Sequence, residues 1–288
     1  MDPIKAGTQA VLKTLSRRGP LRVLKRLYIA MAAIGPTFLG AIRWSFSKTE
    51  DSNFYYALEP QSESNLAHSL ATIFGVTKSQ VLLYFSELKT SNHLFEAQTA
   101  LREADHGMRH LSLEPGRRLI WYAVDRILKP KAILETGVHQ GLGAFALCMA
   151  LDRNHQETGE RGKYFGTDLR SNAGALVRSS KYKLFFHLLE GDSIGSIETL
   201  DEEVELYVSD SDHFAGYESK ELLATALKLG PKSVVISDNS HATSVLSDWS
   251  DKVGRKFTFL EERPNNHWYR GAGVGLSYTE ASVPKAKK

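Results

Sequence analysis

A glycine-rich segment between an apolar run and a helix-like stretch is the first feature of this chain that could carry chemistry. It reads Glu135-Thr-Gly137-Val-His-Gln-Gly141-Leu-Gly143. Glycine permits a tight turn and a close approach of the backbone to a ligand, and the first turn of a helix offers free N–H groups. The spacing differs from the G-x-G-x-x-G fingerprint of dinucleotide-binding proteins. The segment predicts a ligand-binding loop, with a purely structural strand-to-helix turn as the alternative.

An aspartate ends the next apolar run, in the sequence Tyr-Phe-Gly-Thr-Asp168. An acidic group at this place can accept hydrogen bonds from both hydroxyls of a ribose, as it does in enzymes that use nucleotide cofactors. It can also cap the turn that follows. Asp168 therefore predicts a cofactor that contains a ribose, and the capping role stays open.

The elements that must position these residues are short apolar runs separated by helical stretches, and they begin after Pro115. This alternation is typical of βαβ units around a mostly parallel sheet. Helices are expected at Leu142–Leu151 and Ser219–Leu229, with Gly230-Pro231 as a stop before the next strand. The predicted strands are 132–135, 163–167, 185–189, 204–208, 233–237, 257–260 and 274–278. The predicted fold is α/β, with a Rossmann-like, seven-stranded, mostly parallel sheet flanked by helices, whose ligands bind beyond the carboxyl ends of the strands.

The chain before Pro115 shows helical spacing of its apolar residues and no alternation of strands and helices. Apolar residues at helical spacing predict helices at 65–74 and 78–88, with Gly75 as the stop between them. We expect residues 1–114 to form a helical amino-terminal region that serves in oligomerisation, in membrane-surface contact or as a substrate lid. Residues 115–280 form the cofactor-binding domain in this prediction, and residues 281–288 form a basic tail.

Composition limits the class of partner and the compartment. The formal net charge of +3 comes from 36 basic and 33 acidic residues, and much of the excess lies before residue 27 and in the Lys-Ala-Lys-Lys tail. This distribution does not support a nucleic-acid-binding face. The single cysteine, Cys148, excludes an internal disulfide and favours a reducing compartment, so we expect a cytoplasmic protein.

An uncharged run, Leu27–Ile42, follows the basic stretch. Gly35-Pro36 interrupts it, and its 16 residues are few for a membrane span. Two interpretations stay open. The run forms a helix that packs on the main domain or on a second subunit of a homo-oligomer, or it lies on an anionic membrane surface.

The glycine segment also carries a resemblance to a known family. Its pattern Glu-x-Gly-x-x-x-Gly resembles motif I of class I S-adenosylmethionine-dependent methyltransferases, whose loop holds the methionine part of the cofactor. Glu190-Gly-Asp192-Ser193 resembles the family segment that lies beside the adenine. The resemblance implies S-adenosylmethionine as the cofactor, bound by Glu135, Gly137, Gly141, Asp168, Asp192, Ser193 and Asp210.

Two later segments narrow the resemblance. Asp210-Ser-Asp212-His213-Phe-Ala-Gly-Tyr217-Glu218 resembles the Asp-x-Asp-His-x-x-x-Tyr-Glu stretch of a branch that includes sugar and natural-product O-methyltransferases. Asp238-Asn239 resembles the acid–amide pair of metal-dependent catechol-type O-methyltransferases. The resemblance implies a Mg²⁺ site at Asp210, Asp238 and Asn239, because Mg²⁺ prefers hard oxygen ligands.

His213 stands where the catechol-type enzymes carry a lysine. The resemblance implies that it is the general base, and histidine suits this role because an unperturbed imidazole titrates near neutral pH. Acceptor binding and a structural hydrogen bond are the alternatives for His213. The implied reaction is methylation of a hydroxyl on a small-molecule acceptor, namely a sugar, a glycolipid or a secondary metabolite. An NAD-dependent oxidoreductase and a non-catalytic interaction module on the same fold also stay open.

Overall fold

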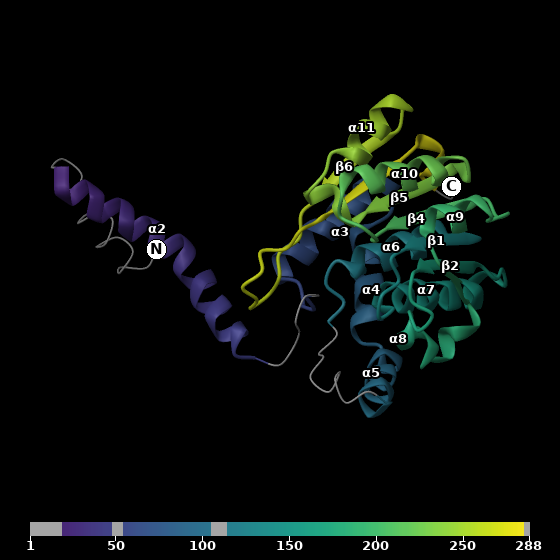
Figure 1. Cartoon of the computed structure of the whole chain (residues 1–288), viewed down its shortest axis with the longest axis horizontal. Helices are drawn as coiled ribbons and strands as arrows, with labels where there is room; N and C mark the ends of the chain where they lie inside the picture. The colour runs from purple at the N-terminus through teal and green to yellow at the C-terminus, as the bar shows by residue number, and fades with distance from the viewer. Residues whose placement is uncertain (1–18, 48–53, 105–113, 285–288) are drawn as a thin grey trace. The chain divides into compact units, whose positions relative to one another are not determined.

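The computed structural model describes residues 19–47, 54–104 and 114–284. Contacts within these ranges divide the chain into two units. One unit contains α2 (Gly19–Ser45) and residues 266–270, and the other contains the sheet and the remaining helices (Figure 1). Residues 1–18 and the last four residues of the predicted basic tail lie outside the described residues.

The larger unit is built on one seven-stranded sheet with the order β3-β2-β1-β4-β5-β7-β6. Strands β1 to β5 pair in parallel, and β7 runs antiparallel to both β5 and β6. The strands are β1 Ala132–Thr136, β2 Lys163–Asp168, β3 Phe186–Glu190, β4 Val204–Ser209, β5 Leu229–Ser237, β6 Lys256–Leu260 and β7 Val274–Tyr278. The chain order reverses between β1 and β4, which is the place where open α/β sheets bind ligands.

All seven predicted strands are confirmed, and only β5 differs by more than one residue at an end. It begins at Leu229, which pairs with Val204 before a register shift. Gly230-Pro231 therefore forms an irregular start of the strand and not a stop before it. The preceding helix, α10 (Ala215–Ala226), also begins and ends earlier than predicted.

Helices cover both faces of the sheet. On one face, α9 (Ser193–Glu198), α10 and α11 (Val245–Lys252) pack on the strands. The buried cluster there contains Leu134, Ile197, Leu200, Val204, Tyr207, Leu222, Val235 and Leu246. The other face carries α6 (Arg118–Leu128) and α7 (Leu142–Thr158), where Gly143 of α7 lies against Trp121 and the Glu135 side chain. The shorter elements are α8 (Ala175–Arg178), η3 (Lys181–Leu184), η4 (Asp238–His241) and η5 (Glu280–Ser282).

Three helices precede the sheet: α3 (Pro60–Phe74), α4 (Lys78–Lys89) and α5 (Asn92–Ala104). The stop at Gly75 is confirmed, because this glycine caps α3 in the left-handed conformation with φ of 66°. The Thr77 side chain accepts a hydrogen bond from Gln80 N and so begins α4. The two predicted helices are therefore present, and α3 begins earlier than expected, at a proline suited to the first turn.

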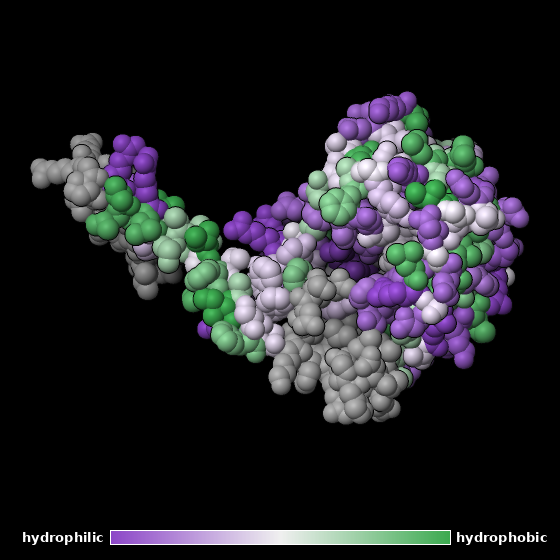
Figure 2. Space-filling model, viewed as in Figure 1, coloured by the Kyte–Doolittle hydropathy of each residue, from purple (hydrophilic) through white to green (hydrophobic). Residues whose placement is uncertain are grey.

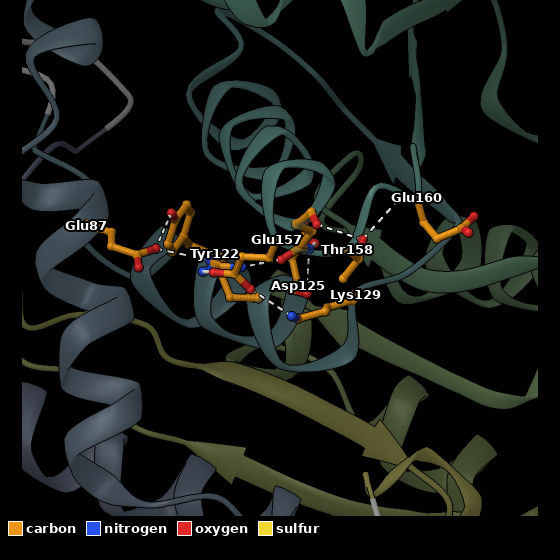
Figure 3. Close-up of polar contacts among 9 residues, drawn as sticks. Glu87, Tyr122, Asp125, Lys129, Glu157, Thr158 and Glu160 are labelled. Atoms are coloured by element: carbon orange, nitrogen blue, oxygen red, sulfur yellow. Dashed lines mark hydrogen bonds and ion pairs between the residues drawn. The ribbon is translucent and has the colours of Figure 1, made fainter.

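A buried polar network fastens α4 to α6 and α7 (Figure 3). The Arg126 guanidinium of α6 contacts Glu87 of α4 at 3.0 Å and also bonds Asn154 and Glu157 of α7. Tyr122 donates a second hydrogen bond to Glu87 at 2.8 Å. Because the Arg126 side chain is only 2% exposed, its charge requires these partners. The network fixes α6, whose first turn reaches the site described below.

The smaller unit is described by itself. Gly40 of α2 lies against Trp268, since a Cβ at Gly40 would lie 3.2 Å from the Trp268 Cβ, and the Trp44 and Trp268 rings are 5.2 Å apart. Hydrophobic side chains along α2 are exposed (Figure 2). In the part of the chain that the structure describes, no individual helix has the length and apolar character to cross a membrane. Arg22–Gly35 and Thr37–Ser45, with a 45° bend between them, meet that criterion only when taken together.

Candidate active site

A cavity of about 240 Å³ lies at the carboxyl ends of β1, β2 and β4. The glycine loop after β1 forms one side of it, and Arg117 and Arg118 at the start of α6 also line it. It brings together six of the predicted site residues, namely Glu135, Gly137, Gly141, Asp168, Asp210 and His213. The other four, Asp192, Ser193, Asp238 and Asn239, do not line this cavity.

The glycine loop is shaped by close backbone contacts. Gly137 has φ of 87°, and its N–H donates to Thr167 O at 3.0 Å. A Cβ at Gly137 would collide with the Asp210 carbonyl group and lie 2.7 Å from Ser211 Cα. Gly141 also has φ of 87° and precedes α7, with Gly174 Cα 2.7 Å from the position of its missing Cβ. Glycine is therefore required where this loop passes the end of β4.

Gly137→Ala is expected to lower the free energy of unfolding by about 1 to 3 kcal/mol, because it adds both backbone strain and a collision with the 210–211 backbone. Urea unfolding measures this change. Gly216→Ala is the matched control, since a Cβ at Gly216 meets nothing within 4 Å. Equal stability of the two variants would contradict the tight loop packing.

Glu135 is fully buried beneath this loop. The Tyr164 hydroxyl donates to its carboxyl group. Burial raises the pKa of Glu135 to about 8, although the Tyr164 hydrogen bond and the Arg118 charge act in the opposite direction. Glu135 is thus neutral below this pH in the absence of a ligand. A cationic ligand beside it would favour its ionisation.

The raised pKa of Glu135 predicts a pH dependence of stability. The folded-state value of about 8 lies above the ordinary 4.5, so the folded protein holds a proton that the unfolded chain loses. The contribution of Glu135 to stability is complete below pH 4.5 and falls as the pH rises toward 8, by up to about 1.4 kcal/mol per pH unit. Urea unfolding at a series of pH values should show a shallower decline for Glu135→Gln than for the wild type. Glu160→Gln, at an exposed position, should keep the wild-type slope, and a wild-type slope in Glu135→Gln would refute the prediction.

The Asp168 carboxylate faces the cavity from the end of β2. It accepts a hydrogen bond from His139 N at 2.8 Å and is paired with the Arg170 guanidinium at 3.0 Å. Burial alone would raise the pKa of Asp168, but the hydrogen bonds from Arg170 and His139 lower it. Asp168 is therefore a charged acceptor, and the exposed Arg170 occupies the oxygens that a ribose would use.

Asp192 and Ser193 belong to a second polar cluster, which fixes the segment that follows β4. Asp192 caps α9 and accepts a hydrogen bond from Tyr217 at 2.7 Å. Ser193 bonds the buried Glu221, which also accepts from Ser211 at 2.6 Å. The structure thus gives Asp192 and Ser193 contacts with α10, and their predicted role beside the adenine stays a prediction.

His213 is held in a defined orientation by an amide. Its Nδ1 bonds Asn239 Oδ1, and Asn239 Nδ2 donates to Asp212 O at 2.9 Å. The second bond fixes which end of the amide faces the histidine, so His213 Nδ1 must carry the proton. In the neutral ring, Nε2 then carries the lone pair.

Two arginines that the sequence reasoning missed complete the site. Arg117 Nη2 donates to Asp238 Oδ2 at 2.6 Å, and Arg117 Nε forms an ion pair with Asp238 Oδ1. Arg118 Nη2 lies 3.9 Å from Asp210 Oδ2. A signal for them exists in the sequence, because positive charges at a helix amino terminus oppose the helix dipole and require acidic partners elsewhere.

The buried acids Asp210 and Asp238 titrate as a pair. Burial and the charge of Asp238 raise the pKa of Asp210 well above its usual range. Burial acts on Asp238 in the same direction, but the charges of Arg117 and Arg118 hold the pKa of Asp238 below its usual value. The negative charge of the pair therefore resides on Asp238.

These contacts do not fit the predicted Mg²⁺ site. Both Asp238 oxygens face the Arg117 guanidinium, and both polar ends of the Asn239 amide have protein partners. Mg²⁺ needs a near-octahedral set of oxygen ligands, and a neighbouring guanidinium opposes a second cation.

Residues 134–240, from β1 to η4, match the family described as a methyltransferase domain. The chain therefore carries a class I S-adenosylmethionine-dependent methyltransferase domain. The match favours a methyltransferase over the NAD-dependent oxidoreductase that the sequence left open. No curated protein sequence matches the methyltransferase significantly.

Solved structures resemble this methyltransferase at low sequence identity. An O-methyltransferase from Streptomyces achromogenes, involved in tomaymycin synthesis and determined with S-adenosylmethionine, has a TM-score of 0.50 and 14% identity over 77% of this chain and 99% of that one. A methyltransferase from Geobacter sulfurreducens has a TM-score of 0.48 and 15% identity over 66% of this chain and 90% of that one. The Streptomyces structure supports the shared fold.

Proposed function

We propose that this methyltransferase methylates a hydroxyl group of a small molecule and that His213 removes the hydroxyl proton. The observation that carries the proposal is the pair of contacts that orient His213, from Asn239 to the ring and from Asn239 to Asp212 O. Because Nδ1 holds a proton against the amide oxygen, Nε2 is the basic nitrogen, and His213 belongs to the cavity lining. A base of this kind suits an oxygen acceptor, whose proton must leave during the reaction.

In the proposed reaction the acceptor oxygen attacks the sulfonium methyl carbon in line with the carbon–sulfur bond. That bond breaks, its electron pair stays on sulfur, and S-adenosylhomocysteine leaves. The acceptor proton passes to His213 Nε2. Orientation of the two reactants can save roughly 7 to 11 kcal/mol of the barrier. The chain supplies this orientation through the loop, the strand-end acids and His213, and no step requires a metal.

We assign cofactor binding to the residues around the cavity. Glu135 would meet the ammonium group of the methionine part, since it lines the cavity together with Gly137 and Gly141. Asp168 would accept from the ribose hydroxyls after Arg170 turns away. Asp192 and Ser193, which lie outside the cavity lining, would lie toward the adenine. Isothermal titration with S-adenosylhomocysteine tests this assignment, and no heat of binding at high micromolar concentration would overturn it.

The proposed acceptor class is supported by the proposed base and by the resemblance to O-methyltransferases. A sugar, a glycolipid or a secondary metabolite offers the hydroxyl that His213 would deprotonate. A screen of such compounds for release of S-adenosylhomocysteine identifies the acceptor. Turnover only with amine or thiol compounds would overturn the assignment to oxygen.

We further propose that the protein works in the cytoplasm at a membrane surface, with α2 as the contact. Exposed Ile34 (49%) and Phe38 (61%) belong to an uncharged stretch that follows Arg22, Lys25 and Arg26. Sedimentation with anionic phospholipid vesicles should capture the full chain and lose it on Ile34→Glu/Phe38→Glu substitution. A dimeric mass without vesicle binding would assign α2 to a subunit contact and overturn the membrane proposal.

A further inference from the structure

Two acids, Asp238 and Glu262, surround a cation that the chain itself provides, the guanidinium of Arg117. Arg117 is nearly buried, with a side-chain exposure of 13%, while the Asp238 and Glu262 side chains have none. Its Nη2 and Nε engage Asp238, and its Nη1 lies 3.3 Å from the Tyr56 hydroxyl and 3.7 Å from Glu262 Oε1. The guanidinium thus has a carboxylate on two sides.

The surroundings of Arg117 come from parts of the chain that are distant in sequence. Tyr56 precedes α3 and donates to Glu262 at 2.6 Å. Glu262 follows β6, and its Oε1 also accepts from Ala272 N and Gly273 N. Asp238 follows β5. A planar guanidinium with donors pointing in several directions can bridge these groups, whereas an ammonium group cannot bind a carboxylate in the same two-pronged manner.

We propose that the Arg117 guanidinium is the resident cation of this methyltransferase and takes the place that the sequence pattern assigns to Mg²⁺. It neutralises Asp238 and holds the chain end of β5, so that the next residue, Asn239, keeps its bonds to His213 and Asp212. Arg117 is a positioning residue in this proposal, because it acts on His213 through Asp238 and Asn239. The proposal rests on the proposed role of His213.

Charge and ligand geometry make a guanidinium and a divalent ion mutually exclusive here. A metal at Asp238 would need the oxygens that Arg117 already contacts, and a metal at Asn239 would need the oxygen that faces His213. Arg118 adds a second positive charge near Asp210. Removal of Arg117 would leave Asp238 without its nearest cation and would free its carboxylate for a metal.

Binding of Mn²⁺, used as a paramagnetic substitute for Mg²⁺, tests the proposal on the full chain without any acceptor. Electron paramagnetic resonance at saturating S-adenosylhomocysteine should show no Mn²⁺ site in the wild type that depends on Asp238, so Asp238→Asn should leave any weak binding unchanged. Arg117→Ala should gain Mn²⁺ affinity by tenfold or more, and Arg117→Ala/Asp238→Asn should lose that gain. Arg117→Lys, which keeps a positive charge, should gain much less.

The outcomes separate this proposal from the proposed function. Wild-type Mn²⁺ binding that Asp238→Asn removes would overturn the resident-cation proposal, and this comparison holds even if Arg117→Ala does not fold. A folded Arg117→Ala that gains no Mn²⁺ affinity would overturn it as well. Failure of S-adenosylhomocysteine to bind the wild type would instead overturn the cofactor assignment, and the Mn²⁺ comparison can then be made without it.

Discussion

Replacing His213 with alanine should lower kcat for methyl transfer by roughly 10²-fold or more, the usual contribution of a positioned general base. The Kd for S-adenosylhomocysteine should change little, because the proposed contact of His213 is with the acceptor and not with the cofactor. The measurement is S-adenosylhomocysteine release with the hydroxyl compound that the screen identifies. His68→Ala, at an exposed position on α3, is the matched control and should keep the wild-type kcat.

The role of the Asn239 amide can be tested in the same assay as the role of His213. Asn239→Ala removes the partner that holds the proton on His213 Nδ1, so it should lower kcat by less than His213→Ala does. An unchanged kcat in His213→Ala would remove this residue from the mechanism. A large loss of affinity for S-adenosylhomocysteine in His213→Ala would instead indicate that His213 binds the cofactor.

The sheet could be predicted because each of its strands can be recognised from its own short stretch of sequence. Each predicted strand is a short run rich in apolar residues, and each of β1 to β5 ends in a polar residue or is followed by a polar residue or glycine. Parallel pairing then brings those ends to one edge, so the ends of β1, β2 and β4 could be placed together from the sequence. The irregular start of β5 was not predictable, because Leu229 is ordered by pairing with Val204 across a register shift.

The proposed site was only partly predictable because its charges come from distant segments. Asp238 is paired with Arg117, which is 121 residues away, and Tyr56 reaches Glu262 across 206 residues. The position of Asp238 at a strand end identified it as a site residue. That position gave no information on which group would contact its carboxylate oxygens. The sequence therefore indicated a metal where the fold supplies an arginine, and the unfavourable placement of Arg117 and Arg118 at a helix start was the available warning.

Glu218 and Glu221 show the same limit within one helix. Glu218 belongs to the family-like segment, and its carboxylate accepts from Ser237 at 2.6 Å and from Thr243 at 2.5 Å. Glu221, one turn later, bonds Ser193 and Ser211. The two glutamates fix the ends of β4 and β5, which a linear motif cannot reveal, because their partners are defined only by the packing of α10 on the sheet.

Cofactor affinity should depend most strongly on Asp168. Two hydrogen bonds from ribose hydroxyls to a charged carboxylate are together worth about 3 to 6 kcal/mol, so Asp168→Ala should weaken S-adenosylhomocysteine binding by roughly 10² to 10⁴-fold. Titration calorimetry measures this change in Kd. Asp152→Ala, which removes an acid of α7 paired with Lys181 at 3.6 Å, should leave the Kd at its wild-type value.

A substitution of Arg170 should change the affinity for S-adenosylhomocysteine in the opposite direction to Asp168→Ala. Its guanidinium is paired with both Asp168 oxygens, so the ribose must displace it before it can bind. Arg170→Ala removes this competitor and should tighten S-adenosylhomocysteine binding, while the His139 N–H keeps the carboxylate in place. Weaker binding in Arg170→Ala would mean that the arginine contacts the cofactor itself. Equal binding in Asp168→Ala and the wild type would show that Asp168 only caps the turn after β2, because the carboxylate would then contribute nothing to the ribose.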